Sequence, residues 1–318
     1  MKLIPLTCAY LKQAKRAIIS NQYLFLLTGK SIIILNKKWE YIKTIEGLKY
    51  AYNGVLSPDE TKLLVISNEP VFYIISLDTL DMVNQCRMRG SVVGIEGQGA
   101  WSLDSQSVKI ITMNKQNTIF SIRTYFVADT HTFEEDVSLG NLFQLYAIVT
   151  TPSEKSTFVL ARRRMTSMTA TQPHSLSLLR YDEGGVGCFE IEKQTGTPLS
   201  MEYNERMKRF VIYTTENSFT CDLEGKNIRE IDTGTPPPKN SQMLFSMPFI
   251  IKQIVESING RYLYVASTGG IDIFNYETGE LIYHKSFSYG LEGITEIEDS
   301  CLIVNLYGGS SKLYKIQE

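Results

Sequence analysis

The sequence predicts an all-β protein, a seven-bladed β-propeller whose blades are four-stranded antiparallel sheets. Three observations lead to this prediction: a complete hairpin unit at Val255 to His284, six further copies of its opening turn and strand, and a second hairpin after all copies but the last. A repeat in the range of about 20 to 50 residues is typical of solenoids and propellers, in which each copy forms one structural unit. The repeat is therefore the main evidence for the fold.

The unit at Val255 to His284 reads VESINGRYLYVASTGGIDIFNYETGELIYH. A polar SING turn precedes the apolar run YLYVA, a Gly-Gly turn precedes the run IDIFNY, and an ETG turn precedes LIYH. Runs of β-branched and aromatic residues bounded by glycine, asparagine and serine are typical of antiparallel strands joined by tight hairpins. The unit is therefore predicted to be one blade.

The opening turn and strand recur along the whole chain. The seven copies are SNQYLFLLT from Ser20, SPDETKLLVIS from Ser57, LDSQSVKIITM from Leu103, PSEKSTFVLA from Pro152, NERMKRFVIY from Asn204, SINGRYLYVA from Ser257 and IEDSCLIVNL from Ile297. In most of the second hairpins an Asp or Asn stands just before the turn, where a short side chain can bond its own backbone. We expect one propeller domain over residues 1–318, with blades at about 16–47, 49–90, 93–140, 142–193, 196–234, 248–288 and 292–318 plus 2–7.

The last copy contains only three strands, because the chain ends at Glu318 soon after SKLYKI. The N-terminal segment Lys2 to Thr7 precedes the first copy and has no blade of its own. We predict that this segment pairs as the outer strand of the last blade, since closure removes the unpaired edges that an open array would expose.

The charge and apolar patterning exclude several classes of partner. The 32 Lys and Arg nearly balance the 34 Asp and Glu, so no overall field attracts nucleic acid or an anionic membrane. No apolar stretch approaches the ~20 residues of a membrane span, and the N-terminal apolar run is too short for a secretory signal.

The five cysteines are odd in number and lack CxxC spacing, which indicates reduced, buried thiols. We expect a cytoplasmic monomer.

The units SPDETKLLVIS and SINGRYLYVAS, with YETGELIYH behind the second, resemble the repeats of WD40-like and YVTN-type β-propellers. The chain departs from the WD40 pattern, because no Gly-His pair opens the blades and no Trp-Asp pair closes the third strand. The resemblance implies a degenerate propeller. It also implies that the loops joining the second to the third strand, and one blade to the next, lie on one face.

Two irregular stretches fall on that predicted face, at Ala161 to His174 and at Thr233 to Pro248. Function is concentrated on such loops. The first stretch contains Arg162, Arg163 and Arg164, the densest charge in the chain. Because side chains alternate along an extended segment, at most two of them can face one partner.

These arginines and His174, aided by Arg87 and Arg89 after the second blade, are candidates for contact with an anion or an acidic peptide. The alternative is a solvated loop base that pairs with nearby Asp and Glu. The run Pro236 to Pro238 in the second stretch is either a polyproline segment that a partner reads or a rigid linker.

Signals for catalysis are weak. The histidines are His131, expected in a hairpin turn, His174 on the irregular loop, and His284 in an outer strand. No nucleophile elbow, P-loop, EF-hand or paired-cysteine zinc motif occurs, so no catalytic residue, metal or cofactor is predicted. The sequence favours a non-enzymatic scaffold that binds a protein or peptide. The alternative is a propeller lactonase acting at the channel mouth, with His174 and Arg162 or Arg164 as its candidate residues.

Overall fold

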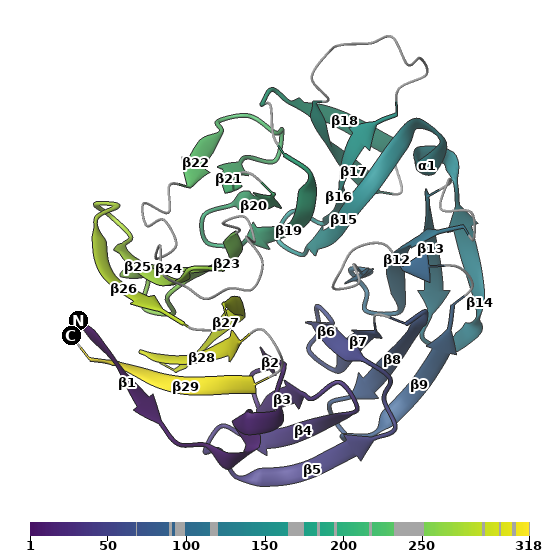
Figure 1. The fold of residues 1–318 in the computed structure, drawn as a ribbon. Coiled ribbons are helices and arrows are strands. Elements are labelled where there is room, and N and C mark those ends of the chain that lie inside the picture. Colours follow the sequence, from purple (N-terminus) through teal and green to yellow (C-terminus); the bar gives the residue numbers. More distant parts are fainter. Residues whose placement is uncertain are drawn as a thin grey trace. The chain divides into compact units, whose positions relative to one another are not determined.

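The computed structural model describes residues 1–67, 69–88, 91–92, 99–114, 120–164, 175–182, 185–193, 196–215, 218–231, 251–287, 290–298, 300–306 and 310–317. In these residues the chain forms seven antiparallel sheets (Figure 1). Six sheets have four strands, and the third has five because two short strands both pair with the first of its three long strands. The fold is a seven-bladed β-propeller, which confirms the predicted fold class. That residues 1–318 form one domain stays a prediction.

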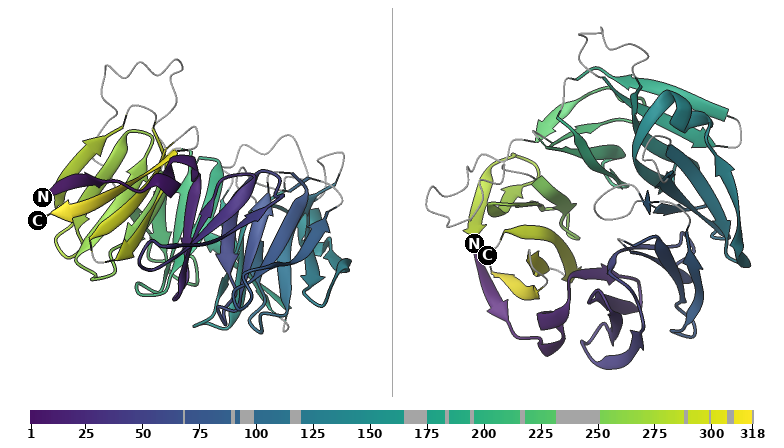
Figure 2. Two further views of the ribbon diagram at one scale, coloured as in Figure 1. Left: turned by 90° about the horizontal axis from the view of Figure 1, so that it is seen from below. Right: turned by 45° about the vertical axis from the view of Figure 1, so that its right-hand side comes forward.

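The chain divides into two compact units, and Figure 2 shows their sheets from two further sides. The first unit comprises Met1–Gly47, Tyr213–Ser218 and Ile231–Glu318. It holds the first sheet, β2 (Arg16–Ile19), β3 (Tyr23–Leu27), β4 (Ser31–Asn36) and β5 (Tyr41–Glu46); the sixth, β23 (Ile251–Glu256), β24 (Tyr262–Ser267), β25 (Gly270–Asn275) and β26 (Leu281–Ser286); and the seventh, β27 (Leu291–Glu298), β28 (Cys301–Leu306), β29 (Ser310–Gln317) and β1 (Lys2–Leu6).

The second unit comprises Leu48–Ile212 and Phe219–Glu230. It holds the second sheet, β6 (Ala51–Leu56), β7 (Lys62–Ser67), β8 (Val71–Ser76) and β9 (Met82–Arg87); the third, β10 (Ser91–Val92), β11 (Gly99–Trp101), β12 (Ser107–Met113), β13 (Phe120–Phe126) and β14 (Asp129–Asp136); the fourth, β15 (Phe143–Thr151), β16 (Ser156–Arg163), β17 (Leu176–Asp182) and β18 (Gly185–Ile191); and most of the fifth, β19 (Pro198–Asn204), β20 (Arg209–Thr214), β21 (Ser218–Cys221) and β22 (Arg229–Ile231).

The predicted closure of the last blade is confirmed. β1 pairs antiparallel with β29 over its whole length, from Lys2 opposite Gln317 to Leu6 opposite Leu313. The two ends of the chain therefore lie side by side (Figure 1). Of the five β1 side chains only Leu3 is buried, and it joins the apolar cluster of the sixth and seventh sheets.

The core lies between neighbouring sheets within each unit. The middle strands are apolar on both faces because each face packs against the next sheet, as in β4, where five of six residues are buried. In the second unit, Phe72 and Tyr125 join the second and third sheets with ring centroids 5.0 Å apart, and Phe158 and Phe210 join the fourth and fifth at 4.9 Å. Outer strands such as β5 are mostly exposed.

The turns between the third and fourth strands form as predicted from their Asp and Asn residues. Oδ1 of Asn36, Asp222 and Asn275 each accepts two backbone N–H hydrogen bonds from residues two to four positions later. These bonds satisfy the turn backbone locally, so the hairpin forms without help from other sheets.

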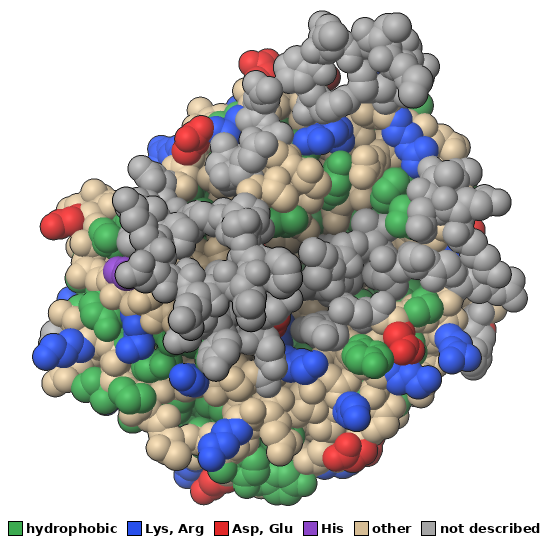
Figure 3. All heavy atoms as spheres, viewed as in Figure 1, with side chains coloured by type: hydrophobic (Ala, Val, Ile, Leu, Met, Phe, Trp, Pro, Cys, Tyr) green, Lys and Arg blue, Asp and Glu red, His purple; other side chains and the backbone are tan. Residues whose placement is uncertain are grey.

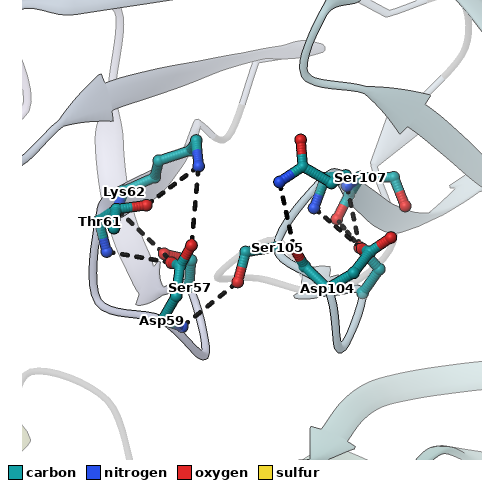
Figure 4. A network of polar contacts seen from close by, with 9 residues as sticks. Ser57, Asp59, Thr61, Lys62, Asp104, Ser105 and Ser107 are labelled. Atoms are coloured by element: carbon teal, nitrogen blue, oxygen red, sulfur yellow. Dashed lines mark hydrogen bonds and ion pairs between the residues drawn. The ribbon is translucent and has the colours of Figure 1, made fainter.

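A second local network shapes the turns between the first and second strands (Figure 4). In the second sheet Ser57 Oγ accepts a bond from the Lys62 N–H at 2.9 Å and donates to Asp59 Oδ1 at 2.6 Å. The same arrangement recurs in the third sheet with Ser102 and Asp104, and in the sixth with Ser257 and Asn259. The Asp59 N–H also donates to Ser105 Oγ at 3.3 Å, which links the turns of the second and third sheets.

Because of this network, the stability of the fold depends on pH in the acid range. Burial opposes the ionisation of Asp59, but hydrogen bonds from Ser57 and Thr61 and the charge of Lys62 outweigh it and lower the pKa of Asp59 to about 2. A carboxyl whose folded pKa is depressed stabilises the fold above its unfolded pKa and loses that contribution as pH falls through the folded value.

We expect the wild type to lose about 1 kcal/mol more unfolding free energy than Asp59→Asn between pH 5 and pH 2, after allowance for solvent screening of this half-exposed group. Urea unfolding at several pH values measures this difference. Parallel pH curves for the two proteins would show that Asp59 contributes nothing.

Three expectations for single residues have definite outcomes. His131 lies in the strand β14, not in the turn, because the turn closes earlier at residues 127–128. His284 lies in the outer strand β26 as expected, and its Nδ1 is 2.7 Å from the buried carboxylate of Asp272. Of the cysteines, Cys86 and Cys221 are buried, whereas Cys188 is exposed because it lies on the outer strand β18.

Candidate functional site

The candidate arginines lie where second and fourth strands end. In an antiparallel four-stranded sheet these two strands run in the same direction, so they finish at one end, which we call the loop end of a sheet. Arg162 and Arg163 are the last residues of the second strand of the fourth sheet, and Arg87 is the last residue of the fourth strand of the second sheet. All three therefore lie at loop ends within the second unit.

Arg162 is half-buried, and its contacts have a structural role. Its Nη2 donates to the carbonyl oxygen of Gly196 at 3.1 Å, in the segment that leads to the fifth sheet. Its guanidinium carbon is 6.0 Å from the ring centroid of Tyr146, which is the extra residue of a bulge in β15. Burial raises the pKa of Tyr146, and the charge of Arg162 opposes that shift. Arg162 thus connects the fourth sheet with the start of the fifth.

Arg164 is also held by its own unit. Its backbone N–H donates to the Leu142 carbonyl oxygen at 2.8 Å, and its Nε donates to the Phe143 carbonyl oxygen at 3.3 Å. The guanidinium carbon is 5.4 Å from the ring centroid of Phe120 in the third sheet. Here the guanidinium satisfies main-chain acceptors and covers an aromatic ring, which are structural roles.

Arg163 and Arg87 are exposed. In the part of the chain that the structure describes, neither side chain makes a hydrogen bond, an ion pair or a ring contact. Within the arginine run, Arg162 contacts the start of the fifth sheet and Arg164 contacts the third sheet, whereas Arg163 between them is exposed. Of the three arginines, Arg163 is exposed and the other two are half-buried, and which of them face a partner stays a prediction.

Arg87 borders a cavity of about 470 Å³ at the loop end of the second sheet. Lys49 and Glu69 also line it, so two cationic groups and one carboxylate surround the opening. The segment that carries Lys49 is well anchored: its backbone N–H donates to the Tyr73 hydroxyl at 2.8 Å, and its carbonyl accepts a bond from Ser67 Oγ. Burial raises the pKa of Tyr73, so its hydroxyl remains neutral near pH 7.

Lys49 and Glu69 were not among the residues that the sequence suggested. The available signal was their position, since each stands just before a predicted strand, in a connection at the predicted loop face. A charged side chain at such a position borders the cavity that lies between the strand connections at the loop end. Charge density alone favoured the run of three arginines instead.

Several candidates lie outside the described residues. These are His174, Arg89, the part of the first irregular stretch from 165 to 174, and the whole second stretch from Thr233 to Pro248. Their convergence on one face stays a prediction.

The described residues show no cluster of metal ligands. Within them, no group of three His, Cys, Asp or Glu side chains gathers closely enough to hold a metal ion. Arg162 and Arg164, the cations weighed for the lactonase alternative, are bonded to main-chain carbonyls. No helix among the described residues is both long and apolar enough to cross a membrane.

The sheets define the chain as a seven-bladed β-propeller. Among solved structures, it resembles the β-propeller domain of Cps50 (Swd1) from Myceliophteria thermophila, with a TM-score of 0.72 over 99% of this chain and 100% of that domain. The two sequences are 10% identical, so the likeness concerns the fold. At the level of sequence, no family model matches the chain, and a comparison with curated proteins gives no match.

Proposed function

We propose that this protein is a non-enzymatic binding propeller that holds an acidic stretch of a partner protein at the loop ends of its second to fourth sheets. The observation that carries the proposal is the exposure of Arg87 and Arg163, two arginines whose side chains make no hydrogen bond, ion pair or ring contact within the described chain. Arginine binds carboxylates in a two-pronged geometry, so exposed and uncommitted guanidinium groups suit acidic side chains.

A protein fits this site better than the other partner classes. The WD40-like fold presents its loops for contact, and the balanced charge of the whole chain gives nucleic acid no extended basic surface. The cavity beside Arg87 also carries Glu69, whose carboxylate would repel a phosphate backbone but can pair with a lysine of the partner. The proposal includes a monomer in the cytoplasm, supported by cysteines without paired spacing.

Charge reversal at Arg87 and Arg163 tests the proposal. Partners are captured from a lysate on the immobilised wild type and identified, and the Kd of each purified partner is then measured for the variants. We expect the double variant Arg87→Glu/Arg163→Glu to bind at least about tenfold more weakly, because it places two like charges against the acidic stretch. Rising salt should weaken the wild-type complex, since both arginines are exposed.

Arg206→Glu is the matched control. Arg206 is an exposed arginine of the same unit, but it lies in the turn between β19 and β20, at the opposite end of its sheet. The control should bind like the wild type. Equal loss in both variants, or full binding by the double variant and by a deletion of residues 165–172, would show that the partner uses another surface.

A further inference from the structure

We propose that a second surface, formed by the outer strands of the seventh and first sheets and by the short helix that follows β1, docks an acidic, apolar segment of a partner protein as an added β-strand. We call it the N-terminal surface, and it consists of Ile4 and Leu6 of β1, Tyr10 of the 3₁₀ helix η1 (Ala9–Gln13), and Tyr41 and Ile42 of β5. All five residues belong to the first unit. The inference does not depend on the arginines at the loop ends.

The side chains of the N-terminal surface are apolar and exposed. Its side chains are exposed at 39% for Ile4, 42% for Leu6, 37% for Tyr10, 51% for Tyr41 and 39% for Ile42. η1 begins three residues after β1 ends, and the Tyr10 ring stacks on the Tyr41 ring with centroids 5.9 Å apart and an angle of 22° between the rings. Hydrophobic side chains reach the surface along the lower edge of Figure 3, where β5 lies in Figure 1. The stacked rings of Tyr10 and Tyr41, with Ile42 next in sequence, form an exposed apolar group of the kind that marks an interaction site.

The charge around this surface indicates what kind of partner it takes. Residues 1–49 carry nine lysines and arginines against two glutamates, whereas the whole chain carries 32 against 34. Lys2, Lys12 and Lys38 are exposed on β1, on η1 and in the turn before β5. The basic charge of the chain is therefore concentrated where the apolar surface lies. Charge complementarity selects an acidic partner segment.

The backbone of β5 favours a protein segment over a membrane as the partner of this surface. β5 is the last strand of its sheet, and no other described strand pairs with its outer edge. Its free N–H and C=O groups can form a ladder with an added strand, whereas lipid tails offer them no hydrogen bond. β1 is a poorer edge because Pro5 has no N–H to donate. We infer that β5 supplies the ladder, and that β1 and η1 supply apolar contacts beside it.

A second outer strand of the same unit shows why the charge matters. β26 also exposes two neighbouring apolar side chains, Leu281 at 40% and Ile282 at 38%. The turn that precedes it carries Glu277 and Glu280, so an acidic segment would be repelled there. Ile282 is a close structural match for Ile42, because each is the unpaired residue of a bulge in an outer strand. It therefore provides the control.

The experiment selects random peptides displayed on phage against the full-length protein and then measures Kd for the enriched peptides. We expect sequences in which Asp or Glu alternates with Ile, Leu or Phe, as an added strand requires. Ile42→Glu should weaken their binding at least about tenfold, whereas Ile282→Glu and the double variant Arg87→Glu/Arg163→Glu should bind like the wild type. Lys12→Glu/Lys38→Glu, which leaves the apolar residues in place, should reproduce the loss and flatten the salt dependence.

Three results would overturn the inference. One is the absence of acidic, apolar peptides among those selected, and another is equal weakening by Ile42→Glu and Ile282→Glu in proteins with unchanged thermal unfolding. The third is a membrane result: the wild type floats with vesicles of about 30% phosphatidylserine in phosphatidylcholine, Ile42→Glu abolishes the flotation, and no peptide binds. This result would assign the surface to a membrane. A DNA duplex that binds in place of peptides would overturn the inference in the same way.

Discussion

Replacement of Gly270 with alanine is expected to lower the free energy of unfolding by more than about 3 kcal/mol. Gly270 begins β25 at φ 146°, directly after the turn from β24. A Cβ at this position would lie 2.2 Å from the Lys285 carbonyl oxygen and 2.9 Å from the Ser286 Cα. Both neighbours are backbone atoms of the paired strand β26, so relief of the clash requires the ladder between the two strands to open. Urea unfolding followed by circular dichroism measures the loss.

Gly279→Ala separates the clash from backbone strain. Gly279 has a positive φ of 70° in the next turn of the same sheet, but a Cβ there meets no atom within 4 Å. The alanine therefore carries only the strain of a left-handed conformation, about 1 kcal/mol. If both variants lost the same free energy, the close approach of β26 to Gly270 would not be the cause.

Deletion of residues 2–6 is expected to lower the unfolding free energy by about 3 to 5 kcal/mol and to cause aggregation at concentrations where the full chain does not aggregate. The deletion removes the whole of β1 and its five residue pairings with β29. It also removes Leu3 from the cluster that contains Tyr314 and Ile316. β29 then becomes an exposed edge rich in apolar side chains. Chemical unfolding and light scattering measure the two effects.

Single substitutions in β1 provide the control for the deletion. Leu3 is 5% exposed and Ile4 is 39% exposed, although they are neighbours. Leu3→Ala should cost about 2 to 3 kcal/mol, whereas Ile4→Ala should change stability by less than about 0.5 kcal/mol. A deletion variant as stable as the full chain, or equal effects of the two substitutions, would contradict the role of β1 as the closing strand.

The number of blades, the order of their strands and the closure by β1 could all be predicted before the structure. The number of blades and the order of their strands depend on local information: the alternation of apolar runs and polar turns sets strand against strand over ten to fifteen residues, as in the hairpin at Tyr262 to Asn275. The closure by β1 followed from the strand count, because the last copy has three strands and an unpaired edge is unfavourable. The turns that contain Asn36, Asp222 and Asn275 complete their own hydrogen bonds. The displacement of the third sheet's turn away from His131 shows that the exact ends of strands are less well defined by such patterns.

The roles of the charged residues could not be predicted, because they depend on partners far along the chain. The sequence does not distinguish Arg162, Arg163 and Arg164. In the structure Arg162 bonds to Gly196 and Arg164 lies over Phe120. Of the three, only Arg163 is therefore exposed. Lys49 and Glu69 border one cavity only because four strand ends of the second sheet meet there.

Taken by itself, the sequence determined the propeller, because strand pairing within a blade follows from short-range patterns that repeat. It also determined the pairing of the two chain ends, because the last copy lacks a fourth strand that the N-terminal segment can supply. Only the tertiary structure decided which arginines are uncommitted and where exposed apolar side chains gather. Tyr10 and Tyr41, in the N-terminal segment and in the first blade, form one surface because packing places their rings in contact. Such contacts are formed by side chains from different elements, and no periodicity along the chain records them.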